Sequence, residues 1–200
     1  MRRVFIAVFL VVACATGAAA GPREDADLAF LSGDYALAAR LLRPFAEKED
    51  ARAQSNLGQL YYRGQGVLQD YQEAMKWFRK AAKQGDEEAQ FNLGGMYALG
   101  KGVPQDAQEA ARWYRRAAEQ GDTLAQLQLG LMYNQGQGVP QDFARAHMWY
   151  NVAAAASSGF MGRITMNSRD QLALQMTAAQ IEKAQEMARR CQQSQFKECD

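Results

Sequence analysis

A stretch of 36 residues occurs three times in succession in this chain, and this repetition constrains the fold more than any other feature. The copies begin at Ala53, Ala89 and Ala125, and no gap separates them. A fixed period of about 20–50 residues is typical of repeat arrays, because one unit cannot bury its apolar face alone. We therefore expect stacked units rather than a single globular core.

Each copy has the pattern of a helix, a glycine loop and a second helix. Apolar residues recur at helical spacing from about Ala51 to Arg63, which predicts the first helix. Gly64-Gln65-Gly66 then ends this helix, because glycine adopts positive φ without steric cost. Asp70 follows at the expected N-cap of the second helix, and Glu73 stands at the capping-box position.

Two further residue types recur within the units and predict how the paired helices pack. Glycine stands inside the first helix at Gly58, Gly94 and Gly130. Because glycine in a helix costs roughly 1 kcal/mol against alanine, its recurrence indicates a close helix contact. Large aromatic residues alternate with alanines on the second helix, which predicts an interlocked core. The aromatic residues are Trp77, Phe78, Trp113, Tyr114, Trp149 and Tyr150.

The repeated pattern AQxxLGxxYxxGxGVxxD, closed by QGD, resembles the Sel-one-like repeat, which is related to the tetratricopeptide repeat. The resemblance covers about residues 53–156 and departs from the pattern at Ser157 and Ser158, where Gly-Asp is usual. It implies an all-α, right-handed α/α solenoid of helix pairs with adaptor roles and no intrinsic catalysis. It also implies an exported bacterial protein, since secreted relatives are common in this family.

The array is expected to lie between two helical caps. Residues 21–52 carry a degenerate unit, in which Gly33-Asp34-Tyr35 stands one period before Gln69-Asp70-Tyr71. The full units are 53–88, 89–124 and 125–158, and the period is expected to fail after Ser158. The C-terminal cap and tail, 159–200, are expected to begin with a loose link from Gly159 to Asn167.

Two helices are expected in the C-terminal cap. The first is a short helix from Arg169 to Gln175. Thr177 and Gln180 form a capping box that opens a final helix from Ala178 to about Cys191.

Residues 1–20 have the composition of a secretory signal peptide. Arg2 and Arg3 precede an apolar run that is too short to span a bilayer, and Ala18-Ala19-Ala20 offers a cleavage site. The expected location is therefore periplasmic or secreted. The alternative is a membrane-anchored lipoprotein, because the residues before Cys14 resemble a degenerate lipobox.

Export makes a disulfide between Cys191 and Cys199 possible. On a continuous helix the two Cα atoms would be about 12 Å apart, beyond the roughly 7 Å that a bridge tolerates. The bridge therefore requires the helix to end near Cys191 and the tail to fold back. A free or intermolecular thiol is the alternative.

The sequence offers little raw material for catalysis, so we expect no enzyme, no metal site and no cofactor. The single histidine, His147, gives neither a metal cluster nor a catalytic triad. We expect it to be structural or at the surface, and a ligand or proton role is the alternative. The GQGV and GKGV loops lack the Walker pattern. The chain has 23 basic and 22 acidic residues, so its net charge is close to zero and does not favour nucleic-acid binding.

Comparison of the units separates packing positions from candidate binding positions. Residues that are identical in every unit, such as Leu57 and Tyr61 with their equivalents, are explained by packing. By analogy with tetratricopeptide arrays, the first helices should line the concave side, and the positions that vary on them are free to bind a partner. The predicted partner-binding residues are Tyr62, Arg63, Phe91, Leu99, Leu127, Leu131, Asn134 and Gln135. For Phe91 and Leu127, packing between adjacent units is the alternative.

The leading hypothesis is an exported, non-catalytic adaptor that binds a protein or peptide. The alternative is a binder of cell-envelope polymer such as peptidoglycan, or a weak cell-wall enzyme. Its basis is a basic stripe on the second helices, for which a solvated surface is the simpler explanation. The stripe consists of Lys76, Arg79, Lys80, Lys83, Arg112, Arg115 and Arg116. A structural spacer or self-assembling unit is a third hypothesis.

Overall fold

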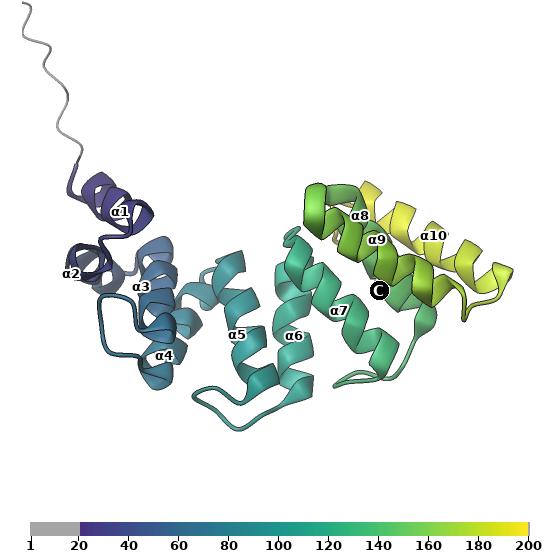
Figure 1. The fold of residues 1–200 in the computed structure, drawn as a ribbon, viewed down its shortest axis with the longest axis horizontal. Coiled ribbons are helices and arrows are strands. Elements are labelled where there is room, and N and C mark those ends of the chain that lie inside the picture. The colour runs from purple at the N-terminus through teal and green to yellow at the C-terminus, as the bar shows by residue number, and fades with distance from the viewer. Residues whose placement is uncertain (1–20, 200) are drawn as a thin grey trace, which may run out of the picture.

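The computed structural model describes residues 21–199, which form ten helices and no strand. The helices are α1 (Pro22–Ser32), α2 (Tyr35–Glu47), α3 (Ala51–Arg63), α4 (Tyr71–Lys83), α5 (Glu87–Leu99), α6 (Ala107–Ala118), α7 (Thr123–Gln135), α8 (Phe143–Ala156), α9 (Gly159–Ala173) and α10 (Ala178–Gln193). From α1 to α9, each helix packs on its neighbours in chain order, and the stack curves into a crescent (Figure 1). The expected all-α solenoid is confirmed.

The three full units are the pairs α3–α4, α5–α6 and α7–α8. We call the first member of each pair the A helix and the second the B helix. Gly64 ends α3 with φ 67°, and its N–H donates to the Leu60 carbonyl. Asp70 caps α4 by accepting from the N–H groups of Gln72 and Glu73. These local signals set the helix boundaries, as the sequence predicted. The capping box expected from Glu73 does not form, because the Asp70 N–H donates to the Tyr61 carbonyl and Glu73 forms an ion pair with Lys76.

Each A helix is held close to its B helix where a glycine meets an aromatic ring. A Cβ atom added at Gly94 would lie 2.6 Å from Cδ1 of Tyr114. Gly58 and Gly130 face Phe78 and Tyr150 in the same way. Real Cβ atoms do not approach other atoms this closely, so the predicted packing role of these glycines is confirmed.

Polar contacts join each B helix to the A helix that follows. Arg79 donates to the Tyr97 hydroxyl across 2.9 Å, and Arg115 donates to Tyr133 at the same separation of 18 residues. A second contact lies within a unit, since Gln84 Nε2 at the end of α4 lies 2.8 Å from Gln54 Oε1 in α3. The arginine–tyrosine contacts repeat with the period of the sequence, so they fix how one unit sits on the next.

The expected loose link from Gly159 to Asn167 and the short helix from Arg169 to Gln175 are wrong. Residues 159–173 form one helix, α9, which begins 36 residues after the start of α7. Thr165, at the position of Leu129 in α7, is 1% exposed against α8. Arg169 Nη1 lies 3.2 Å from Asn151 Oδ1, again 18 residues away. The helix period therefore continues past Ser158.

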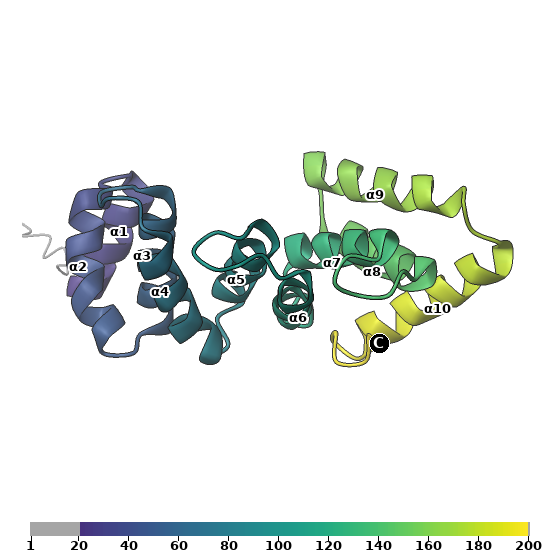
Figure 2. The same cartoon turned by 90° about the horizontal axis from the view of Figure 1, so that it is seen from below.

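The final helix also begins at the expected place but does not pair with α9. Thr177 and Gln180 form the predicted capping box of α10. This helix packs along α8, and Figure 2 shows α9 and α10 diverging on its two sides. Met166 replaces the glycine of earlier A helices, and Glu186 replaces the aromatic residue of earlier B helices. The close glycine–aromatic contact therefore has no equivalent between α9 and α10.

Helix α8 carries apolar residues on the side that α10 covers. Met148 and Val152 stand where α6 carries the exposed Arg112 and Arg116. Both apolar side chains are buried in α8. The buried side of α10 is made of Ala184, Ala188 and Cys191. Small apolar side chains thus seal α10 against α8, while its charged residues face solvent.

The tail after α10 folds back on the core. Cys191 and Cys199 form a disulfide with a Cα–Cα distance of 4.4 Å. The helix ends at Gln193, and the chain reverses through Gln195 and Phe196, both at positive φ. Phe196 packs against the core cluster of the last units. The disulfide therefore fixes the reversal that the spacing of the two cysteines requires.

Candidate functional site

Three A helices line one groove of about 360 Å³, which we call the A-helix groove. Its walls come from α3, α5 and α7: Gln59, Arg63, Glu87, Glu88, Phe91, Asn92, Asp122 and Leu124. Most of them lie at the N-terminal ends of α5 and α7, below the hollow of the crescent (Figure 1). The capping aspartates start both helices at the same level, so the side chains of successive units meet here.

The groove carries acidic groups in a partly desolvated setting. Burial raises the pKa of Glu88, and the nearby charge of Asp86 raises it further. Gln59 donates a hydrogen bond to the Glu88 carboxylate, and the positive charge of Arg63 attracts that carboxylate. Both contacts oppose the increase in the pKa of Glu88. Burial also raises the pKa of Asp122. A cation entering the groove would therefore stabilise the charged form of these carboxyl groups.

The structure brings two of the eight predicted residues, Arg63 and Phe91, into this groove. Phe91 is half-buried, and its ring lies 5.7 Å from the ring of Tyr114 between centroids. Burial raises the pKa of the Tyr114 hydroxyl to about 12. Phe91 thus both packs within its unit and forms part of the groove floor.

Leu131 lies in a second hollow between α5 and α7, lined also by Ala98, Gln128 and Met132. The side chain is 36% exposed. This hollow is bordered by the glycine loops that follow both helices, through Gln105 and Gln137. Leu131 therefore belongs to the same row of A helices but to a separate depression.

Tyr62 lies in neither hollow. Its ring meets Tyr71 at 5.4 Å between centroids, and its hydroxyl accepts from Lys101 Nζ across 3.0 Å. Lys101 comes from the glycine loop of the next unit and also lies over the Tyr71 ring. The contact of Tyr62 thus joins two units.

The remaining predicted residues are also spread apart. Leu127 is half-buried against the core. Asn134 forms a hydrogen bond with Tyr150, whose pKa burial raises to about 12. Leu99 and Gln135 are exposed at the C-terminal ends of α5 and α7. None of these four lines the A-helix groove.

Glu88, Asn92 and Leu124 line the groove but are absent from the predicted set. Glu88 and Leu124 stand at equivalent positions, where α3 has Arg52. The variation rule that selected the other candidates would also have selected this position. A comparison of the first turns of the A helices would therefore have identified this position from the sequence.

His147 lies inside α8 and is 4% exposed. Burial lowers its pKa, and the charge of Arg169 lowers it further, while Asp170 opposes this effect. The imidazole is thus a packing residue between α8 and α9. Within residues 21–199, no group of three or more His, Cys, Asp and Glu residues could hold a metal ion.

The basic stripe lies on the exposed side of α4 and α6. Lys80 Nζ lies 4.6 Å from the centre of the Trp77 ring, and the Arg116 guanidinium lies at the same distance from Trp113. Arg115 is the one stripe residue that is half-buried, and both Arg115 and Arg79 donate to a tyrosine hydroxyl. Lys80 and Arg116 are thus stacked on aromatic rings at the edge of the core.

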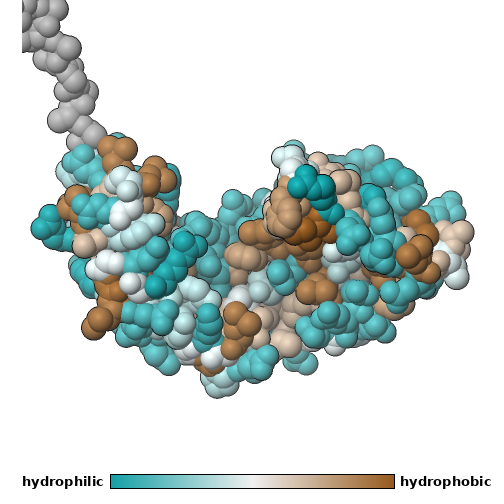
Figure 3. Space-filling view, in the orientation of Figure 1, coloured by the Kyte–Doolittle hydropathy of each residue, from teal (hydrophilic) through white to brown (hydrophobic). Residues whose placement is uncertain are grey.

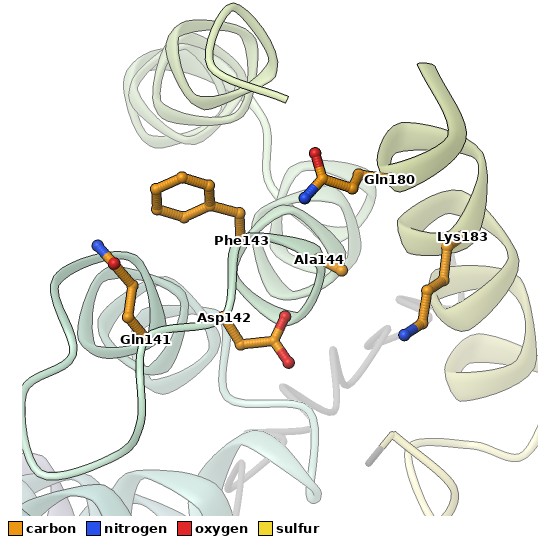
Figure 4. Close-up of a pocket in the computed structure, with 6 residues that line it drawn as sticks. All are labelled: Gln141, Asp142, Phe143, Ala144, Gln180 and Lys183. Atoms are coloured by element: carbon orange, nitrogen blue, oxygen red, sulfur yellow. The ribbon is translucent and has the colours of Figure 1, made fainter. Parts of the chain in front are cut away.

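A further depression lies between α8 and α10, shown in Figure 4. Asp142 and Lys183 face it from the two sides, with Gln141 and Gln180 at its rim. Asp142 already caps α8 by accepting from the Arg145 N–H. The depression is a shallow seam where α10 meets the last full unit.

No helix in the described part of the chain is long and apolar enough to cross a membrane.

Stacked helix pairs and a groove built from equivalent positions define an α/α-repeat scaffold. The chain belongs to the Sel1 repeat family, whose sequence model matches residues 51–86, 87–122 and 123–158. Each match begins two residues before the repeat boundary expected from the sequence. Members of this family are generally scaffolds that mediate protein–protein interactions.

Two solved structures show the likeness in three dimensions. The first is c5321, a protective antigen of uropathogenic Escherichia coli with the same type of fold (TM-score 0.71, 37% identity over 80% of this chain). The second is a Sel1 repeat protein from Oxalobacter formigenes (TM-score 0.63, 35% identity over 70% of this chain). The chain spans 34% and 59% of the lengths of these two proteins. A comparison with the curated proteins finds no match.

Proposed function

We propose that this chain is an exported, non-catalytic adaptor that binds a protein or peptide in the A-helix groove. The observation that carries the proposal is the groove itself, in which Arg63, Glu88 and Leu124 come from three different units. These positions vary between units, so the packing of the solenoid does not prescribe them. Their mixture of charge and apolar surface suits a polypeptide ligand.

Export is supported by the chemistry of the C-terminus. The disulfide between Cys191 and Cys199 persists in an oxidising compartment, such as the bacterial periplasm or the cell exterior. The predicted signal peptide and Cys14 lie outside the described residues. We propose a periplasmic or secreted protein, with a lipid anchor on Cys14 as the alternative.

A site-specific photo-crosslinker tests the proposed surface in the native envelope. We would place it at Asn92 in the groove and, as a control, at Arg112 on the exposed side of α6. A discrete protein captured from Asn92 and not from Arg112 is the expected result. The double variant Arg63→Glu, Leu124→Asp should lose this capture while its melting temperature stays unchanged. Capture from Arg112 alone would place the function on the opposite side.

The basic stripe supports a second candidate, the binding of anionic envelope polymer. The stacked cations Lys80 and Arg116 are held in place by aromatic rings, which favours a fixed charged surface. Sedimentation with purified peptidoglycan tests it at low and high salt. Salt-sensitive binding that is lost in Arg112→Glu, Arg116→Glu would favour this function over the adaptor.

A further inference from the structure

Helix α9 extends the row of A helices beyond the three that line the A-helix groove and beyond the residues that the family model matches. Helix α9 occupies the place of a further A helix, as its register with α7 and its contact through Asn151 and Arg169 show. In the three full units the B helix packs along its own A helix, whereas α10 packs along α8. Much of the surface of α9 is therefore left open.

The exposed side of α9 continues the row of groove positions. Phe160 stands one period after Leu124, and Ile164 stands one period after Gln128. Their side chains are 68% and 36% exposed, and Leu124 is 41% exposed. In α3 the same two positions hold Arg52 and Asn56, so the row changes from polar to apolar toward the C-terminus.

Figure 3 shows apolar surface gathered around the N-terminal parts of α7 and α9, on the wall of the hollow. A contiguous apolar patch with a polar rim marks an interaction site, whereas scattered exposed residues do not. On its other side the patch borders the acidic part of the groove, with Glu87, Glu88 and Asp122.

We propose that α9 is part of the partner-binding surface, and that the groove takes a peptide segment with a Lys or Arg beside Glu88 and apolar side chains over Leu124, Phe160 and Ile164. This inference rests on the proposed function and deepens it. The occupant follows from charge complementarity, since the acidic groups outnumber the single cation, Arg63, among the residues that line the groove. The apolar positions follow without interruption from those of α7.

The acidic groups also explain why a cationic residue should bind there. The Glu88 carboxyl is partly buried, next to Asp86 and Asp122. Arg63 attracts the Glu88 charge, and a positive ligand group would relieve the repulsion among the three acids. The neighbouring apolar side chains would exclude water from that contact and strengthen it.

The test uses a random 12-residue peptide library displayed on phage and selected on the chain that begins at Gly21. Enriched peptides should combine at least one Lys or Arg with two or more aromatic or aliphatic residues. Enrichment of acidic peptides would overturn the inference. The best peptide, labelled with fluorescein, then serves as the probe in anisotropy titrations.

The variant Phe160→Ser, Ile164→Ser should bind the probe at least about tenfold more weakly, as expected for the loss of central apolar contacts. Leu174→Ser is the matched control, because Leu174 is 80% exposed at the far end of α9. Glu88→Gln should weaken binding and reduce its dependence on salt. Circular dichroism should show unchanged helicity in every variant.

The outcomes separate this inference from the proposed function. If Arg63→Glu, Leu124→Asp abolishes binding while the α9 variant binds normally, the groove is the site and the inference about α9 is wrong. If neither variant changes binding, the proposed function fails as well. A dimer in light scattering that Phe160→Ser converts to a monomer would show that a second copy, and not a peptide, covers the patch.

Discussion

The Arg169 guanidinium donates a hydrogen bond to Asn151 Oδ1 across 3.2 Å, where one unit earlier Arg115 donates to the Tyr133 hydroxyl. Donor and acceptor have exchanged helices, yet the separation of 18 residues is the same. The contact therefore preserves the junction between a B helix and the following A helix although the residue types have changed. It is the clearest sign that α9 is stacked as a member of the array.

Replacement of Gly94 by alanine should destabilise the protein by roughly 1–3 kcal/mol, because the new methyl group would overlap the Tyr114 ring. Gly95→Ala is the matched control on the same helix. Its Cβ would lie 3.6 Å from the Tyr114 hydroxyl, an ordinary contact, so helix propensity should stabilise it by up to about 1 kcal/mol. Urea unfolding followed by circular dichroism measures both changes. Equal effects would show that the ring contact is unimportant.

Replacement of Ala156 by glutamine should stabilise the last full unit. Gln126 Oε1 is buried without a hydrogen-bond partner, whereas its equivalents Gln54 and Gln90 accept from glutamines at the end of the B helix of the same unit. The missing donor would come from position 156. A restored bond is worth roughly 0.5–1.5 kcal/mol, measured as an increase in the free energy of unfolding. Ala155→Gln, one residue away, should change nothing; a similar gain there would argue for a general helix effect.

The stability of the protein should fall between pH 7.5 and 5.5 partly because of His147. Burial and the charge of Arg169 lower the pKa of the folded imidazole, so the unfolded chain binds the proton more readily. This contribution is fully present above the unfolded pKa of about 6.5 and is lost as the pH falls toward the lowered value. His147→Met places at this site the residue found at the equivalent Met75, which is also buried. Urea midpoints at both pH values should show a smaller acid-induced loss for the variant than for the parent chain.

Reduction of the disulfide between Cys191 and Cys199 should release the tail. The short loop that it closes predicts a loss of about 2–3 kcal/mol of local stability. Phe196 would then leave its contact near Gly121, and amide protons after Arg190 should exchange faster. Hydrogen exchange with and without reductant measures the effect. A Cys191→Ala, Cys199→Ala variant should exchange fast under both conditions, and a slow tail in that variant would contradict the prediction.

The boundaries of the A and B helices were predictable because local residues set them. Gly64 and Asp70 act through their own backbone and side-chain geometry, so no tertiary information was needed. The full length of helix α9 was not predicted, because its residues do not match the repeat pattern. Its position depends on its packing against α8. Two indirect signals in the sequence pointed to this packing. Asn151 and Arg169 are 18 residues apart, and the apolar Met148 and Val152 stand where the preceding B helix has charged residues.

The candidate site was only partly predictable for a related physical reason. Of the residues that variation between units selected, Arg63 and Phe91 line the A-helix groove. Variation could not tell that Tyr62 meets Lys101 of the next unit, or that Asn134 meets Tyr150 of its own unit. Which varying side chains face one hollow depends on the tilt of each helix against its neighbours.

The way α10 turns onto α8 also decides how far this array can extend. A growing stack needs a terminal pair in which the A and B helices pack on each other, and here α10 packs on α8 instead of on α9, with its tail closed by a disulfide. Because the spacing of helices continues unbroken through α9, whole units could be duplicated or lost upstream during evolution without disturbing this ending. Relatives of different lengths could therefore share the same terminal structure, with length changing only in steps of one unit.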